Sequence, residues 1–167
     1  MAASILSPCS TGKEVLIVRE FAAPRELVFD AWIDPEQLMR WYAPAECTIQ
    51  FRALDPRPGG TFHSCIRTPT GKECWCRGVY RTVNRPVQIV FTMVVANERG
   101  EAVDPSAVGM DPDWPLETVV TVTFVPKGSR TVLTLHQTVS ESLAKRTGAH
   151  PSWLQMFDRL AALVARN

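Results

Sequence analysis

One histidine and three cysteines lie within the short stretch FHSCIRTPTGKECWC, residues 62–76. Imidazole nitrogen and thiolate sulfur are the usual ligands of zinc, so a metal or redox site is the first chemistry to consider. The spacing His-x-Cys followed by Cys-x-Cys matches no standard zinc pattern, however. Whether these side chains can share one ion depends on the register of the two strands that carry them.

The segment TPTGK at 68–72 predicts a tight hairpin turn between these strands. Pro69 suits the second position of a type I turn, and Gly71 suits the left-handed residue that follows in a three-residue loop with a glycine bulge. This turn fixes the cross-strand pairs, which are Thr68–Lys72, Ile66–Cys74, Ser64–Cys76 and Phe62–Gly78.

In this register His63 and Cys65 point to one face of the sheet, whereas Cys74 and Cys76 point to the other. A slip of one residue would bring all four to one face and permit zinc binding, but the turn residues argue against that slip. A Cys74–Cys76 disulfide is disfavoured because residues two apart on a strand lie nearly 7 Å apart. We therefore predict no metal and no cofactor, and cysteines that fill a strand face as free thiols.

Composition narrows the class of protein. Of 167 residues, 46% are hydrophobic and 21% are charged, which favours a packed domain over disorder. The net charge of +1 and the scattered Arg and Lys argue against nucleic-acid binding. No apolar run approaches the roughly 20 residues of a membrane span. Five cysteines without a secretion signal favour reduced thiols and a cytoplasmic location.

The pattern of apolar and turn residues predicts a flexible tail over 1–12 and a single domain over 13–167. Trp153, Met156, Phe157, Leu160 and Val164 form one apolar stripe of a C-terminal helix. The polar segment 97–115 is expected to be a mobile loop or a lid. The expected order is a strand at 14–21, short helices within 22–33 and 34–42, strands at 47–55, 61–67, 74–83, 87–95, 117–125 and 130–139, and a long helix from about 151 to 164.

Five segments occur in a recognisable order: REFAAPRELVFDAWIDPEQLMRWYAP, LDPRPGGTF, GVYRTVNRPVQIVFT, TVTFVPKGSRTVLTLHQ and WLQMFDRLAALVA. From about Val15 to Val164 the chain thereby resembles the activator of heat-shock-protein-90 ATPase homologue family, within the START/Bet v 1-like (SRPBCC) superfamily. The resemblance implies an α+β helix-grip fold. In this fold a curved antiparallel sheet of six to seven strands surrounds a long C-terminal helix, two short helices follow the first strand, and a cavity lies between sheet and helix.

Two positions depart from the family pattern. The family often has Gly-Trp at the start of the last helix, where this chain reads PSW at 151–153. It also often carries a histidine near the end of the last strand, where this chain has Gln137. No role of that histidine is carried over.

If the hairpin register holds, the concave face of the sheet and the last helix enclose a mostly apolar space with a few polar groups, as in small-molecule pockets. The small residues Ser64 and Gly78 are expected to leave volume unfilled. The alternative is that the same side chains form a solid core. The predicted ligand-binding residues are Trp41, Phe62, Ser64, Cys74, Cys76, Tyr80, Phe91, Met93, Gln137, Trp153, Met156 and Phe157.

The predicted function is the binding of a small hydrophobic or aromatic ligand in this cavity. Acid–base catalysis requires a titratable group beside the substrate, and only Tyr80, Cys74 and Cys76 are candidates, so no catalytic residue is predicted. A cyclase- or hydrolase-like enzyme that uses the same cavity is the second hypothesis. A co-chaperone-like interaction module, which the family resemblance implies, is the third. The sequence is compatible with a homodimer, and it locates no surface for a chaperone partner.

Overall fold

The computed structural model describes residues 13–166, so the predicted flexible tail over 1–12 lies outside the described residues. The seven strands form one antiparallel sheet in the order β1-β7-β6-β5-β4-β3-β2. Their bounds are β1 Glu14–Phe21, β2 Thr48–Leu54, β3 Thr61–Arg67, β4 Glu73–Asn84, β5 Gln88–Ala96, β6 Glu117–Lys127 and β7 Arg130–Ser140.

Two short helices follow β1, as predicted: α1 at Arg25–Asp30 and α2 at Pro35–Trp41. The side chain of Asp34 caps α2 by accepting a hydrogen bond from the Glu36 N–H, and Pro35 occupies the first turn, where its missing N–H is harmless. This cap separates the two helices and fixes the start of the segment that leads to Tyr42.

The chain ends in two helices rather than one. Helix α3 (Glu141–Thr147) precedes the long helix α4 (Ala149–Val164), and Gly148 joins them with a φ of 89° that favours glycine. Helix α3 was not predicted. The predicted apolar stripe of α4 is confirmed, since Trp153, Met156, Phe157 and Leu160 are all buried.

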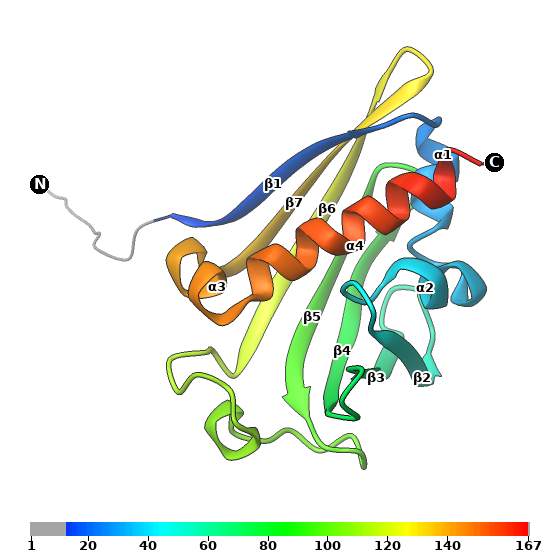
Figure 1. Ribbon diagram of the computed structural model, residues 1–167. Helices are drawn as coiled ribbons and strands as arrows, with labels where there is room; N and C mark the ends of the chain where they lie inside the picture. The colour runs from blue at the N-terminus through cyan, green and yellow to red at the C-terminus, as the bar shows by residue number, and fades with distance from the viewer. Residues whose placement is uncertain (1–12, 167) are drawn as a thin grey trace, which may run out of the picture.

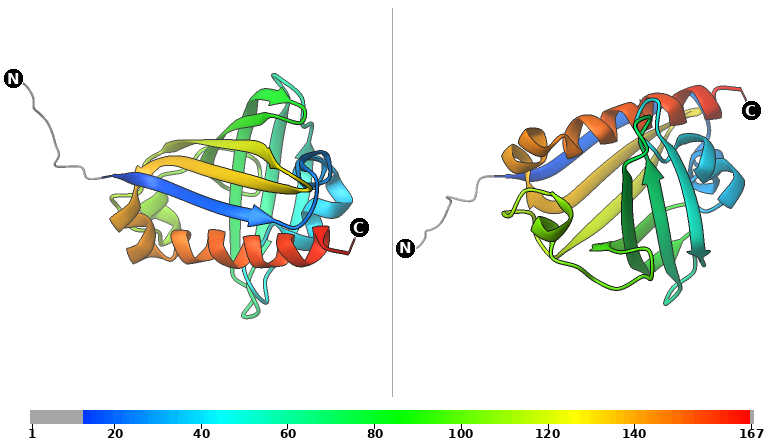
Figure 2. Two further views of the ribbon diagram at one scale, coloured as in Figure 1. Left: turned by 90° about the horizontal axis from the view of Figure 1, so that it is seen from above. Right: turned by 60° about the horizontal axis from the view of Figure 1, so that its bottom comes forward.

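The sheet is strongly curved and wraps around α4 (Figure 1). Figure 2 shows β1 and β7 running beside α4, whereas β3, β4 and β5 stand across it at the far end of the sheet. Helices α1 and α2 close that far end (Figure 1). The predicted fold class, a curved antiparallel sheet around a C-terminal helix, is confirmed.

The hairpin register is also confirmed: Ile66 pairs with Cys74, Ser64 with Cys76 and Phe62 with Gly78. The Thr68 N–H donates to the Lys72 carbonyl, and Gly71 has a φ of 90°, as the predicted turn requires. The turn residues therefore set which side chains of β3 and β4 face α4.

The segment that follows β5 contains a short 3₁₀ helix, η2, at Pro105–Val108. Arg146 of α3 ties this segment to the helical end of the molecule, because its Nη2 lies 3.1 Å from a carboxylate oxygen of Asp111 and 3.4 Å from one of Asp113. Among the described residues, none of the helices combines the length and the apolarity that crossing a bilayer requires.

Candidate functional site

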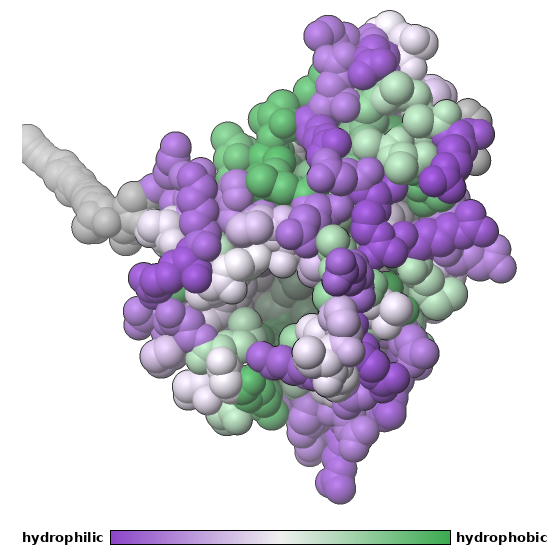
Figure 3. All heavy atoms as spheres, in the orientation of Figure 1, coloured by the Kyte–Doolittle hydropathy of each residue, from purple (hydrophilic) through white to green (hydrophobic). Residues whose placement is uncertain are grey.

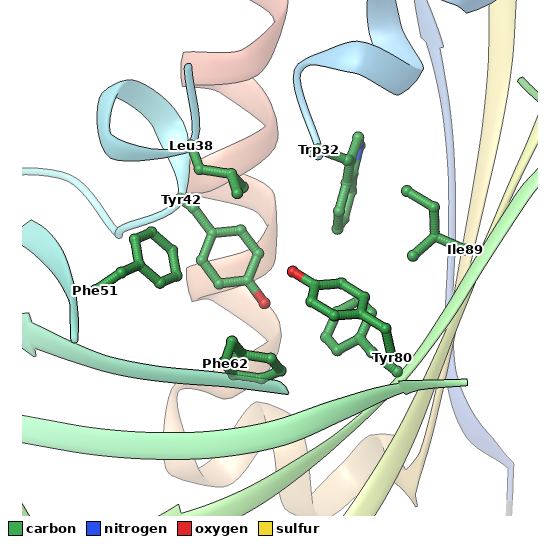
Figure 4. Close-up of a pocket in the computed structure, with 8 residues that line it drawn as sticks. Trp32, Leu38, Tyr42, Phe51, Phe62, Tyr80 and Ile89 are labelled. Atoms are coloured by element: carbon green, nitrogen blue, oxygen red, sulfur yellow. The ribbon is translucent and has the colours of Figure 1, made fainter. Parts of the chain in front are cut away.

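An aromatic pocket lies between the short helices and the far end of the sheet (Figure 4). Eight side chains line it, and they come from five elements and the turns beside them. The lining residues are Trp32, Leu38, Tyr42, Phe51, Phe62, Tyr80, Ile89 and Phe91. None of them carries a formal charge, so the pocket is suited to an apolar guest.

The open part of the pocket is small. About 20 Å³ is available to the centre of a water molecule, within about 330 Å³ that is free of atoms but includes space open to solvent. One water needs roughly 10–15 Å³ of the space available to its centre, so the pocket holds little more than a water or two. The walls therefore meet across most of the interior, and a larger guest requires side chains to move.

Trp32 accounts for much of this filling. Its ring stacks on Trp153 of α4, with ring centroids 6.4 Å apart and an interplanar angle of 29°, and it also lies 6.2 Å from the Phe157 ring. On its other sides it contacts Trp41 at 4.7 Å and Phe91 at 6.4 Å. Trp32 thus occupies the space beneath α4 and confines the pocket to the side of α1 and α2.

Tyr42 reaches the pocket from the end of α2. The segment after it is fastened to α4, because Arg159 Nη1 donates to the carbonyl oxygen of Ala43 at 2.7 Å, and the Ala45 N–H donates to the Gln155 side chain at 3.0 Å. These hydrogen bonds hold the turn that follows α2 against the long helix. The Tyr42 ring lies edge-on to the Trp153 ring, with centroids 5.9 Å apart, and it stays partly exposed.

Tyr80 reaches the same pocket from β4. The register of β4 against β5 shifts between Tyr80 and Thr82, and this irregularity changes the direction of the strand at Tyr80. The Tyr80 backbone is fixed to the preceding turn, because its N–H donates to the Gly60 carbonyl and its carbonyl accepts from the Gly59 N–H, both at 2.8 Å. Figure 4 shows the hydroxyls of Tyr42 and Tyr80 directed toward the same space.

Burial controls the protonation of the polar groups near this site. Desolvation raises the pKa of Tyr80, and desolvation together with neighbouring Cys76 and Tyr80 raises the pKa of Tyr42. Burial also raises the pKa of the Cys76 thiol to about 12. The residue as a whole stays partly accessible. At neutral pH all three groups are protonated, so both phenols are available as hydrogen-bond donors.

Three of the twelve predicted ligand-binding residues line the pocket, namely Phe62, Tyr80 and Phe91. Trp41 is buried behind the pocket, and its Nε1 donates to the Ala31 carbonyl at 2.8 Å. Ser64 is buried on β3, Cys76 is partly buried opposite it, and Met156 and Phe157 belong to the core beneath α4.

Gln137, Trp153 and Met93 form a separate polar cluster under the start of α4. The Trp153 Nε1 donates to Gln137 Oε1 at 2.9 Å, and Gln137 Nε2 donates to Thr118 Oγ1 at 3.1 Å. The Met93 sulfur lies 3.9 Å from the same amide nitrogen. Gln137 therefore fastens the long helix to β6, since an indole N–H can only donate and fixes which amide atom faces it.

Two expectations about the hairpin wall are wrong. Cys74 is exposed near the hairpin turn, so it does not contribute to the interior. Gly78 leaves no free volume, because a Cβ added there would lie 1.9 Å from the Thr92 carbonyl oxygen and 2.4 Å from a Phe62 ring carbon. The Phe62 ring and the neighbouring strand fill the space that the missing side chain was expected to leave.

The histidine and cysteines of 62–76 do not assemble into a metal site. In the part of the chain that the structure describes, no three side chains of His, Cys, Asp or Glu are placed to hold an ion. His63 instead lies 3.0 Å from the Asn97 carbonyl through its Nε2, and its ring is 5.1 Å from that of Trp75. Cys47, Cys65, Cys74 and Cys76 are free thiols.

Four lining residues were not predicted to belong to the site: Trp32, Leu38, Tyr42 and Phe51. Trp32 and Leu38 were recognised only as apolar faces of short helices, and Phe51 lies on an edge strand. Tyr42 did carry a signal: the chain has only two tyrosines, and Tyr80 was already a predicted pocket residue.

Comparison with known proteins identifies relatives by sequence and by structure. Residues 22–165 match the family described as activator of Hsp90 ATPase homolog 1-like protein. No curated protein matches the chain.

The solved structures share its fold. A solution structure from Arthrobacter aurescens has a TM-score of 0.77 at 24% identity, covering 91% of this chain and 86% of that one. A crystal structure from Chromobacterium violaceum has a TM-score of 0.74 at 22% identity, covering 90% and 95%. A crystal structure of protein Ms6760 from Mycobacterium smegmatis has a TM-score of 0.74 at 22% identity, covering 89% and 88%.

Proposed function

This chain belongs to the activator of Hsp90 ATPase homolog 1-like family, and we propose that it binds a small, largely apolar molecule in the pocket between its short helices and its sheet. The observation that carries the proposal is a pocket whose eight lining side chains are all aromatic or aliphatic. Proteins of this fold family commonly bind hydrophobic ligands, which supports the same role.

A guest larger than water can enter only if some of the lining side chains move. Tyr42 and Phe51 are only partly buried, in contrast to Phe62 and Tyr80, so they are the lining residues with space to move. Figure 3 shows a hollow on the face drawn in Figure 1, below α4, with hydrophobic atoms at its floor and a rim of mixed hydropathy. An apolar guest is expected to enter the pocket on the side of Tyr42 and Phe51, its partly exposed walls.

The chemistry of the lining supports binding rather than acid–base catalysis. The pocket residues include no carboxylate, imidazole or amine, and the two phenols have raised pKa values that keep them protonated. A general base must accept a proton near neutral pH, which a protonated phenol of raised pKa does poorly. The cyclase- or hydrolase-like alternative therefore lacks a base among the lining residues.

Titration with ethylbenzene, followed by two-dimensional amide NMR, tests the proposal. We expect saturable shifts for the wild type that weaken at least tenfold in Leu38→Phe, because the larger ring fills the pocket. Leu154→Phe makes the same change on the exposed side of α4 and should bind like the wild type. Melting temperatures check that both variants fold.

Absence of saturable shifts in the wild type, or equal binding by Leu38→Phe, would contradict the proposal. The partner-binding role that the family description names would then be the leading alternative.

A further inference from the structure

The chain contains two tyrosines, Tyr42 and Tyr80, and both line the same pocket. They come from opposite walls, one from the end of α2 and the other from β4. Figure 4 shows their hydroxyl groups facing the same central space rather than the surrounding strands. Two polar groups therefore converge at one point of an otherwise apolar lining.

Neither hydroxyl forms a hydrogen bond with another residue among 13–166. Desolvation is the main cause of the raised pKa of each tyrosine. Tyr80 is 6% exposed, and neither hydroxyl is fully sealed from water, so each can be reached from the pocket. Tyrosine hydroxyls that are buried usually find a hydrogen-bond partner, because an unpaired polar group away from water is costly. The pair is thus left with hydrogen-bonding capacity that a guest can use.

A third donor belongs to the same lining. Trp32 is 3% exposed, and its Nε1 is a buried polar atom with no hydrogen-bond partner in the described part of the chain. It lies at the end of the indole away from the two hydroxyls in Figure 4, so it does not join them. The only polar side-chain atoms of the eight lining residues are thus two O–H groups and one N–H group, and each can donate a hydrogen bond.

We propose that the guest is an aromatic or alicyclic carbonyl compound whose oxygen lies between the hydroxyls of Tyr42 and Tyr80. This inference rests on the proposed function and specifies the chemical class of its ligand. A carbonyl oxygen has two lone pairs and can accept from both hydroxyls at once. The apolar remainder of the molecule then contacts Phe51, Phe62 and Phe91, which line the same pocket.

The absence of charge from the lining favours a neutral acceptor over an anion. The eight lining residues include no Lys or Arg to offset a buried carboxylate, and an unpaired buried charge is far more costly than a neutral polar group. Arg159, which lies near the end of α2, is engaged by the carbonyl oxygens of Ala43 and Pro44. A ketone or a similar neutral carbonyl therefore fits better than an acid.

Two probes of nearly equal shape isolate the contribution of the oxygen. Acetophenone and ethylbenzene differ by one carbonyl in place of a methylene group, so their affinities share the same apolar contacts. We expect the wild type to bind acetophenone about three- to tenfold more tightly, the range expected of one or two net hydrogen bonds. Both affinities are measured by the same amide NMR titration, in which Trp indole cross-peaks also report binding near Trp32.

Replacement of both hydroxyls should abolish the preference. In Tyr42→Phe/Tyr80→Phe the affinity for ethylbenzene should stay the same or rise, while the ratio of the two affinities falls to about one. Phe51→Leu is the matched control, because it trims an apolar wall and should weaken both probes without changing their ratio. Each single Tyr→Phe variant should give an intermediate ratio.

The outcomes separate this inference from the function on which it rests. If the wild type binds both probes equally, or if the double variant keeps the preference for acetophenone, the inference is wrong while the binding function stands. If neither probe binds the wild type, both are wrong.

Discussion

The indole ring of Trp32 stacks on that of Trp153, with centroids 6.4 Å apart and planes inclined by 29°. This contact joins the end of α1 to the start of α4 across the interior of the molecule. It separates the small pocket beside α1 and α2 from the space beneath the long helix. Trp32 is therefore expected to limit the size of the proposed guest.

Removal of most of that side chain should enlarge the pocket. Trp32→Leu is expected to lower the free energy of unfolding by about 3 kcal/mol, because it removes buried contacts with several rings and leaves a cavity. The cavity should accept naphthalene, which the wild type is too filled to bind. Chemical denaturation measures the first effect, and the naphthalene-induced rise in melting temperature measures the second. Equal rises in the variant and the wild type would show that Trp32 does not limit the pocket.

The side-chain amide of Gln137 should contribute more to the free energy of unfolding than an exposed amide of the same type. Gln137→Met leaves the Trp153 N–H and the Thr118 hydroxyl without their partner, which is expected to cost about 1–3 kcal/mol. Gln155→Met is the control, because its side chain accepts one hydrogen bond at the surface and should cost less than about 1 kcal/mol. Urea denaturation compares the two variants. Equal costs would argue against a special role of Gln137 in holding α4.

Gly78 should tolerate no side chain. Gly78→Ala places a Cβ 1.9 Å from a carbonyl oxygen of β5, so we expect a loss of more than about 3 kcal/mol or failure to fold. Gly71→Ala is the comparison, because that glycine has open space around it but a φ of 90°, and the strain should cost about 1 kcal/mol. Chemical denaturation midpoints compare the stabilities of the two variants. A Gly78→Ala variant as stable as Gly71→Ala would be inconsistent with the packing of Phe62 described above.

Stability should fall at alkaline pH, and Cys76 should be one cause. Its pKa is raised from 9.0 to about 12 in the folded state, so the unfolded chain loses the thiol proton first as the pH rises. The stabilising effect is complete below pH 9 and is lost progressively between pH 9 and 12. Under reducing conditions, Cys76→Ala should therefore lose less free energy of unfolding between pH 8 and 10.5 than the wild type. A parallel loss in both proteins would mean that the thiol is not desolvated.

The hairpin and the sheet were the most predictable parts of the fold, because local residues specify them. Pro69 and Gly71 determine the turn, and the turn determines every cross-strand pair up to Phe62 and Gly78. Helix α3 could have been predicted as well, since Ser140 caps it, Lys145 and Arg146 lie in its last turn, and Gly148 ends it. These helix signals were overlooked because they directly follow the strand pattern of β7.

The pocket was less predictable because its position depends on contacts between distant segments. Trp32 was recognised as an apolar residue of a short helix, but nothing in the pattern shows that its ring crosses the interior to Trp153. Gly78 likewise suggested free volume, whereas the Phe62 ring from the neighbouring strand occupies it. Side-chain volumes along one strand do not reveal which side chain of a neighbouring strand packs over a small residue.

Intermolecular nuclear Overhauser effects in a complex with acetophenone test the central claim most directly. We expect contacts from the ring protons of acetophenone to the methyl groups of Leu38 and Ile89, which line the pocket. Contacts confined to Leu16, Val18 or Leu116, which are exposed on the surface, would contradict it. A wild-type protein that gives no contacts at saturating acetophenone would contradict it equally.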